Sequence, residues 1–173
     1  MSASVRPSSD NVCGVTTSGP AESAFRALVK TFGLLRRVME PYFTQFGISG
    51  PQWGILWTLH DADLQGQPLL RLTDLGDRLI VRPPSVTGVV DRLQKMGLVA
   101  RSTSPTDQRA KFVRLTARGR KLVEQILQQH PGQIRKVLGG LEETEQRDLQ
   151  RLLERLEPHL SAVADASEKE ADE

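Results

Sequence analysis

The sequence has few of the features expected of a membrane, secreted or metal-binding protein. Its 173 residues include one cysteine, Cys13, which excludes a disulfide framework and a zinc site built from several thiolates. No apolar run approaches the ~18 residues of a bilayer-spanning helix, and the start of the chain has no apolar segment of the kind found in a secretory signal. We therefore expect a cytoplasmic protein without membrane contacts.

Patterns that would indicate catalysis, a metal or a cofactor are missing as well. The histidines, His60, His130 and His159, are far apart and show no paired ligand spacing. The sequence contains no glycine-rich phosphate loop, nucleophile elbow or His-Glu-x-x-His pattern. Cys13 lacks the nearby cations that would favour a reactive thiolate, which argues against a redox sensor. We predict no enzyme and no bound metal or cofactor.

Positive charge is concentrated in the middle of the chain. Residues 71–120 contain 11 Lys and Arg but only 4 Asp and Glu, a local net charge of +7, whereas the rest of the chain carries −5. A basic segment between neutral or acidic flanks is typical of proteins that bind polyanions such as nucleic acid.

Apolar periodicity divides the chain into helical segments and one hairpin. Thr73 and Thr116 are expected helix caps, and Gly97 is the expected left-handed residue after a helix. The pattern predicts a disordered tail over 1–20, a helix from Ala21 that Pro41 kinks or breaks near residues 39–40, and a helix from Ser49 to about His60. Short helices over 73–79 and 83–96 and strands over 98–103 and 110–115 are expected next. The chain is expected to end with a helix after Thr116 that Pro131 kinks or interrupts, a helix over 143–164 and an acidic tail over 166–173.

This order predicts a mainly α fold with one β-hairpin (α+β), arranged as a winged helix-turn-helix core. Residues 51–120 form the expected DNA-binding lobe within a single domain over 21–165. The apolar stripes of 21–46 and 121–165 exceed what one lobe can cover, so we expect these outer helices to mediate dimerisation.

Residues 72–97 have the pattern of a helix-turn-helix, in which the second helix enters the major groove. Val86, Val89, Val90 and Leu93 share one side of that helix and are expected to pack inward. Small and charged groups, Asp91 among them, remain on a face narrow enough for a groove about 12 Å wide. The predicted DNA contacts of this segment are Arg82, Ser85, Thr87, Gly88, Arg92 and Lys95.

The hairpin that follows adds a second candidate contact. Its connection contains Asp107 and Arg109, and Lys111 lies just beyond. An arginine at this place can enter the neighbouring minor groove, where narrow A·T-rich tracts concentrate negative potential. Asp107 is expected to orient Arg109 through a charge-assisted pair.

Several motifs together resemble the MarR family of bacterial transcription regulators. They are Pro51-Gln52-Trp53, the run LTDL at 72–75, the run VTGVVDRLQKMGLVAR at 86–101, and the hairpin pattern from Asp107 through Arg109, Lys111, Val113 and Leu115-Thr116 to Gly119. With the order of the helices, the resemblance covers residues 21–165.

The resemblance implies a homodimer, formed by the first and last helices, on a pseudo-palindromic double-stranded operator. By this motif Ser85, Thr87, Gly88 and Arg92 would face bases or phosphates, and Arg109 the minor groove. It also implies a repressor that a small, often phenolic, effector releases from DNA. Aromatic side chains that we consider as lining for such a pocket, with a core role as the alternative, are Phe32, Tyr42, Trp53 and Trp57.

Two positions depart from the family's pattern. Ile80 stands where the turn often has Gly, and Arg82 stands where the recognition helix often has a capping Ser. We therefore expect a weak side-chain cap on this helix and a phosphate contact from Arg82.

Other functions fit a winged helix. One is a DNA-binding protein that recognises DNA structure rather than an operator and has no effector; another is a protein-interaction module, against which the +7 segment argues. Half-sites at dimer spacing and release by an effector would distinguish the regulator from the first.

Overall fold

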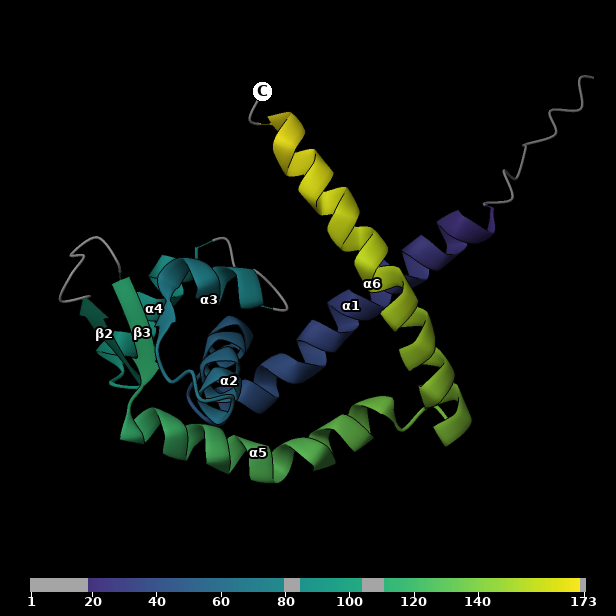
Figure 1. Ribbon diagram of the computed structural model, residues 1–173. Helices are drawn as coiled ribbons and strands as arrows, with labels where there is room; N and C mark the ends of the chain where they lie inside the picture. The colour runs from purple at the N-terminus through teal and green to yellow at the C-terminus, as the bar shows by residue number, and fades with distance from the viewer. Residues whose placement is uncertain (1–18, 80–84, 104–110, 172–173) are drawn as a thin grey trace, which may run out of the picture. The chain divides into compact units, whose positions relative to one another are not determined.

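The computed structural model describes residues 19–79, 85–103 and 111–171, in two compact units, Met1–Arg36 and Arg37–Glu173. Almost all of the tail predicted over 1–20 lies outside the described residues. The elements follow the predicted order (Figure 1), and they are α1 (Pro20–Thr44), α2 (Gly50–Leu64), β1 (Leu70–Arg71), α3 (Leu72–Arg78), α4 (Val86–Lys95), β2 (Val99–Thr103), β3 (Lys111–Leu115), α5 (Ala117–Leu138) and α6 (Glu143–Ala171). The mainly α fold with a winged helix-turn-helix is thereby confirmed.

The hairpin is part of a larger sheet than the sequence predicts. β2 and β3 pair in antiparallel register from Val99 opposite Leu115 to Thr103 opposite Lys111. β1 adds to the other edge of β3, so the described sheet has three strands in the order β1-β3-β2. The prediction of a lone hairpin was wrong because a two-residue strand is too short to show alternation in the sequence.

Proline does not break the helices that contain it. α1 continues through Pro41 and α5 through Pro131, so of the kink or break predicted near Pro41 the break is excluded. A proline removes one intrahelical hydrogen bond, whereas Tyr42 and Phe43, which follow Pro41 directly, are both buried and anchor the helix there. α5 bends along its length (Figure 1), as expected of a helix with an internal proline.

Other predicted boundaries need smaller corrections. α6 reaches Ala171, so most of the segment expected as an acidic tail is helical. α2 runs on past His60 to Leu64, and α3 takes Arg71 rather than Thr73 as its N-cap, without a side-chain hydrogen bond. The expected cap Thr116 is confirmed, because its hydroxyl accepts the N–H of Gly119 at 3.0 Å.

The core surrounds α2, which contacts α3, α4, α5 and β3. Ile55 and Leu56 of α2 are fully buried, and an Arg120–Asp63 ion pair of 2.7 Å links α2 to α5 at the edge of the core. This core holds α3, α4 and the sheet as one lobe. The largest fully buried side chains are Ile55, Leu56, Leu59, Leu75, Val90, Leu93, Val113, Leu115, Val123 and Ile126.

Candidate nucleic-acid interface

Helix α4 presents one buried and one exposed side, as the sequence predicts. Val89, Val90 and Leu93 are buried against the lobe. Thr87, Arg92 and Lys95 are exposed, while Gly88 is half-buried. Neither Arg92 nor Lys95 forms an ion pair within the described part of the chain, so both cations are available to phosphates.

The start of α4 corrects the expectation of a weak cap. Ser85 is the N-cap, and its hydroxyl oxygen accepts the backbone N–H of Gly88 at 3.0 Å. A serine at this position satisfies a backbone donor that the helix itself leaves unpaired. Arg82 lies outside the described residues. The hydroxyl proton of Ser85 is not used by this bond.

Arg101 of β2 joins the wing to the recognition helix, a role that the sequence reading missed. Its guanidinium lies 2.6 Å from the carboxylate of Asp91 and donates to the carbonyl oxygen of Thr87 at 3.3 Å. Asp91, which the pattern left on the outward face, is therefore paired within the lobe. The sequence signals this pair only by placing opposite charges on a helix and on the strand that follows it. The turn at Gly97 then brings Asp91 and Arg101 together.

The junction behind α4 is tightly connected. Gly97 has φ +71, the left-handed conformation that was expected of it. The Thr116 hydroxyl lies 2.8 Å from the carbonyl oxygen of Gly97 and 3.1 Å from that of Leu98. One side chain therefore links the end of α4, the start of β2 and the first turn of α5.

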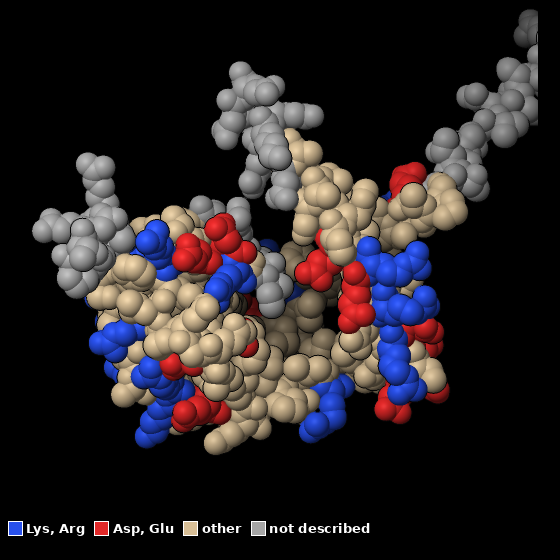
Figure 2. Space-filling model, viewed as in Figure 1, with Lys and Arg blue, Asp and Glu red and all other residues tan. Residues whose placement is uncertain are grey.

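The wing carries cations on its described strands. Lys111 begins β3, opposite Thr103, and is exposed. The guanidinium of Arg71 on the neighbouring strand β1 lies over the ring of Phe112 at 5.8 Å from its centroid. Asp107 and Arg109 lie outside the described residues. Figure 2 shows Lys and Arg side chains at several places on one face of the lobe, with Asp and Glu among them.

Three of the four aromatic residues considered for an effector pocket meet at the junction of α1, α2 and α5. Tyr42 and Trp53 are buried and belong to the core, and Trp57 is half-buried. Phe32 is exposed and belongs to the unit Met1–Arg36.

His130 of α5 lies among these rings, 5.7 Å from Tyr42 and 5.5 Å from Trp53 between centroids. Burial lowers the pKa of His130 and raises that of Tyr42, whose hydroxyl donates to the carbonyl oxygen of Ile126 at 3.2 Å. Nδ1 of His130 has no hydrogen-bond partner in the described part of the chain. The ring cluster around His130 thus combines apolar rings with one unused hydrogen-bonding atom, Nδ1 of His130.

A core-anchored helix with an exposed polar face, followed by a two-stranded wing, defines a winged helix-turn-helix protein. None of the described helices is long and apolar enough to cross a membrane.

Comparison with known proteins agrees with this class. The model of the MarR family matches residues 48–111. The chain is 30% identical over 139 residues to the transcriptional regulator FarR of Neisseria gonorrhoeae, covering 80% of this chain and 89% of FarR. It is 31% identical to the transcriptional repressor YetL of Bacillus subtilis, covering 76% of this chain and 77% of YetL.

Solved structures share the fold. A mutant of E. coli MarR, complexed with operator DNA, superposes with a TM-score of 0.69 at 23% identity, covering 80% of this chain and 99% of that one. Bordetella bronchiseptica BpsR, whose DNA binding is regulated by 6-hydroxynicotinic acid, gives a TM-score of 0.69 at 24% identity and coverages of 81% and 96%. The chain belongs to the MarR family. It is a DNA-binding transcriptional regulator and not an enzyme.

Proposed function

We propose that this regulator is a cytoplasmic repressor that reads a pseudo-palindromic operator with α4 and holds it with the wing. The observation that supports this most directly is the exposed polar face of α4, fixed to β2 through the Arg101–Asp91 pair. Sequence specificity requires side chains at base edges, and phosphate contacts position the protein without reading sequence.

In this proposal the small groups at the start of α4 approach base edges and the cations approach phosphates. Ser85, Thr87 and Gly88 take the first role, Arg82, Arg92, Lys95 and Lys111 the second, and Arg109, oriented by Asp107, enters the minor groove.

The experiment is a panel of operator variants titrated at two salt concentrations. Lys111→Gln should lower affinity about equally for every sequence and reduce the salt slope by about one unit. Thr87→Val should change which operator variants are preferred. Lys136→Gln, an exposed cation in the last turn of α5, serves as the matched control and should change neither quantity.

The same panel tests the alternative of structure-specific binding. If the Thr87 and Lys111 variants lose affinity by the same factor on every sequence, α4 does not read bases, and a protein that recognises DNA shape is the better description.

We further propose that two copies associate through α1 and α6. Both helices expose apolar side chains, and contiguous exposed apolar surface marks association sites. Deleting residues 141–173 should give monomer or aggregate in sedimentation experiments, and a folded, DNA-binding dimer after this deletion would contradict the assignment. The exposed residues are Phe25, Leu28, Val29, Phe32, Leu34, Leu35 and Val38 of α1 and Leu149, Leu152, Leu153, Leu160 and Val163 of α6.

The effector of the proposed repressor is a small aromatic or phenolic molecule. The regulation of the Bordetella relative by 6-hydroxynicotinic acid supports this class. Of the four candidate residues, Tyr42, Trp53 and Trp57 belong to the ring cluster, whose unpaired His130 nitrogen favours a planar ligand that accepts or donates one hydrogen bond there. The test is whether such a ligand quenches tryptophan emission and lowers operator affinity over the same concentration range.

A further inference from the structure

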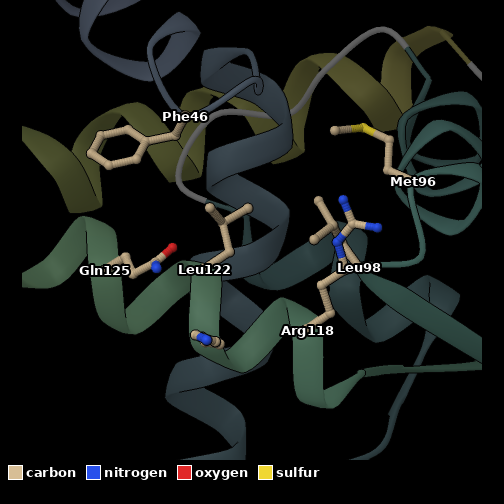
Figure 3. Close-up of a pocket in the computed structure, with 7 residues that line it drawn as sticks. Phe46, Met96, Leu98, Arg118, Leu122 and Gln125 are labelled. Atoms are coloured by element: carbon tan, nitrogen blue, oxygen red, sulfur yellow. The ribbon is translucent and has the colours of Figure 1, made fainter.

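A cavity lies where α4 ends and α5 begins (Figure 3). Its volume is about 310 Å³, at the lower end of the range in which small-molecule sites occur. It lies wholly within the unit Arg37–Glu173 and contains none of the aromatic residues considered above. Its lining comes mainly from Phe46, Met96, Leu98, Leu122, Arg118 and Lys121.

The apolar part of this lining comes from three places in the chain. Phe46 follows α1, Met96 and Leu98 flank the turn that ends α4, and Leu122 lies in the first turns of α5. The unbranched side chain of Met96 has three rotatable bonds and can adapt to an occupant beside the ring of Phe46. A flexible alkyl body therefore fits this part of the cavity.

The polar part of the lining is cationic. Arg118 and Lys121 are both exposed on α5, and Gln125 is the remaining polar neighbour. Among the described residues, no acidic side chain lines the cavity. Within the described part of the chain, neither Arg118 nor Lys121 forms an ion pair or a side-chain hydrogen bond. The guanidinium of Arg118 lies near the turn that follows α4, because its Nη1 would be 3.9 Å from a Cβ placed on Gly97. Two unpaired cations beside an apolar hollow suit a ligand with one anionic end.

We propose that this cavity binds a small monocarboxylate with an alkyl body. The ligand's alkyl chain packs between Phe46, Met96 and Leu122. Its carboxylate is held by Arg118 and Lys121. The regulatory part of this inference rests on the proposed function: the ligand contacts the C-terminal turn of α4 and neutralises positive charge on the DNA-binding lobe, so it lowers operator affinity.

The test is calorimetric titration of the full chain with sodium octanoate, using 1-octanol as the uncharged ligand of equal length. The wild type should bind octanoate and bind octanol at least about tenfold more weakly. Arg118→Gln with Lys121→Gln should weaken octanoate binding about tenfold or more, because charge-assisted hydrogen bonds are lost. Arg135→Gln with Lys136→Gln removes the same charge from the last turn of α5 and should leave octanoate binding unchanged.

Operator titration with and without octanoate completes the test. Octanoate should weaken operator binding by the wild type and the control, but not by the Arg118/Lys121 variant. The assignment is overturned if the wild type does not bind octanoate, if octanol binds equally well, or if the Arg118/Lys121 variant binds octanoate normally and only loses affinity for DNA. That last outcome would make these cations phosphate contacts.

The two proposals fail separately. A chain that binds its operator but not octanoate retains the proposed function without this site. A chain that binds octanoate but shows no sequence preference on DNA retains the site without the proposed function.

Discussion

Gly119 in the first turn of α5 lies against the carbonyl oxygen of Leu98, so closely that a Cβ at position 119 would come within 2.1 Å of that oxygen. The neighbouring atom is backbone and belongs to the segment that Thr116 also holds. The start of α5 can therefore approach the wing only with glycine at this position.

We expect Gly119→Ala to lower the free energy of unfolding by about 3 kcal/mol or more, because backbone must move to accommodate the methyl group. Gly132→Ala in the same helix is the matched control. A Cβ there has no neighbour closer than 4.0 Å, so this variant should be about 0.5–1 kcal/mol more stable than the wild type. Urea unfolding measures both, and equal stability of the two variants would contradict the close approach.

The Arg101–Asp91 pair should stabilise the lobe modestly and matter more for DNA binding. Asp91 is about half exposed, so we expect a coupling free energy of about 0.5–1 kcal/mol in a double-mutant cycle of Arg101→Gln and Asp91→Asn. Because Arg101 also bonds the carbonyl oxygen of Thr87, either variant should lower operator affinity by misplacing α4. Arg114→Gln, an exposed cation on β3, is the control for lost charge. If Arg101→Gln or Asp91→Asn lowers operator affinity only as much as Arg114→Gln does, the pair does not position α4.

Arg109→Ala should weaken operator binding by ~1–3 kcal/mol if its side chain enters the minor groove. Asp107→Ala should have a smaller effect, since it acts only by orienting Arg109. Both residues lie on the connection between β2 and β3, and fluorescence anisotropy with labelled operator measures both. Wild-type affinity of the Arg109 variant would show that the wing does not read DNA.

His130 should make the fold less stable as the pH falls. Burial lowers its pKa from the ordinary 6.5, so around that pH the unfolded chain binds more protons than the folded one. The stability that neutral His130 contributes is complete at pH values above the pKa of His130 in the unfolded chain. It is lost as the pH falls from that pKa toward the lower pKa of His130 in the folded chain. Between about pH 7.5 and about pH 5.5, His130→Gln should therefore lose less stability than the wild type. His159→Gln on α6 is the control and should follow the wild type.

The sequence predicts best what rests on local periodicity. The inward side of α4 and the cap at Thr116 follow from spacing and residue type within a few positions, and the structure confirms both. The N-cap Ser85 was missed because the helix was expected to begin at Pro83, whereas the described helix begins at Val86.

What the sequence does not predict depends on distant partners. β1 exists because Leu70 and Arg71 find Val113 and Phe112 across the sheet, and two residues carry no period of their own. The Arg101–Asp91 pair likewise depends on β2 folding back against α4, and the cavity beside Arg118 lies where α4 ends and α5 begins. Continuity through Pro41 goes with the burial of Tyr42 and Phe43, which the local rule for proline ignores.

The aromatic cluster gives the protein an optical reporter of its own. The chain has two tryptophans, and both lie on α2 with ring centroids 5.8 Å apart. Trp53 stacks on Phe43 at 5.7 Å and lies 5.5 Å from the imidazole of His130. Coupled indoles at this distance give strong near-ultraviolet circular dichroism, and a protonated imidazole beside them quenches their emission. Intrinsic fluorescence will therefore follow the junction of α1, α2 and α5, while changes confined to the wing will leave the spectrum unaltered.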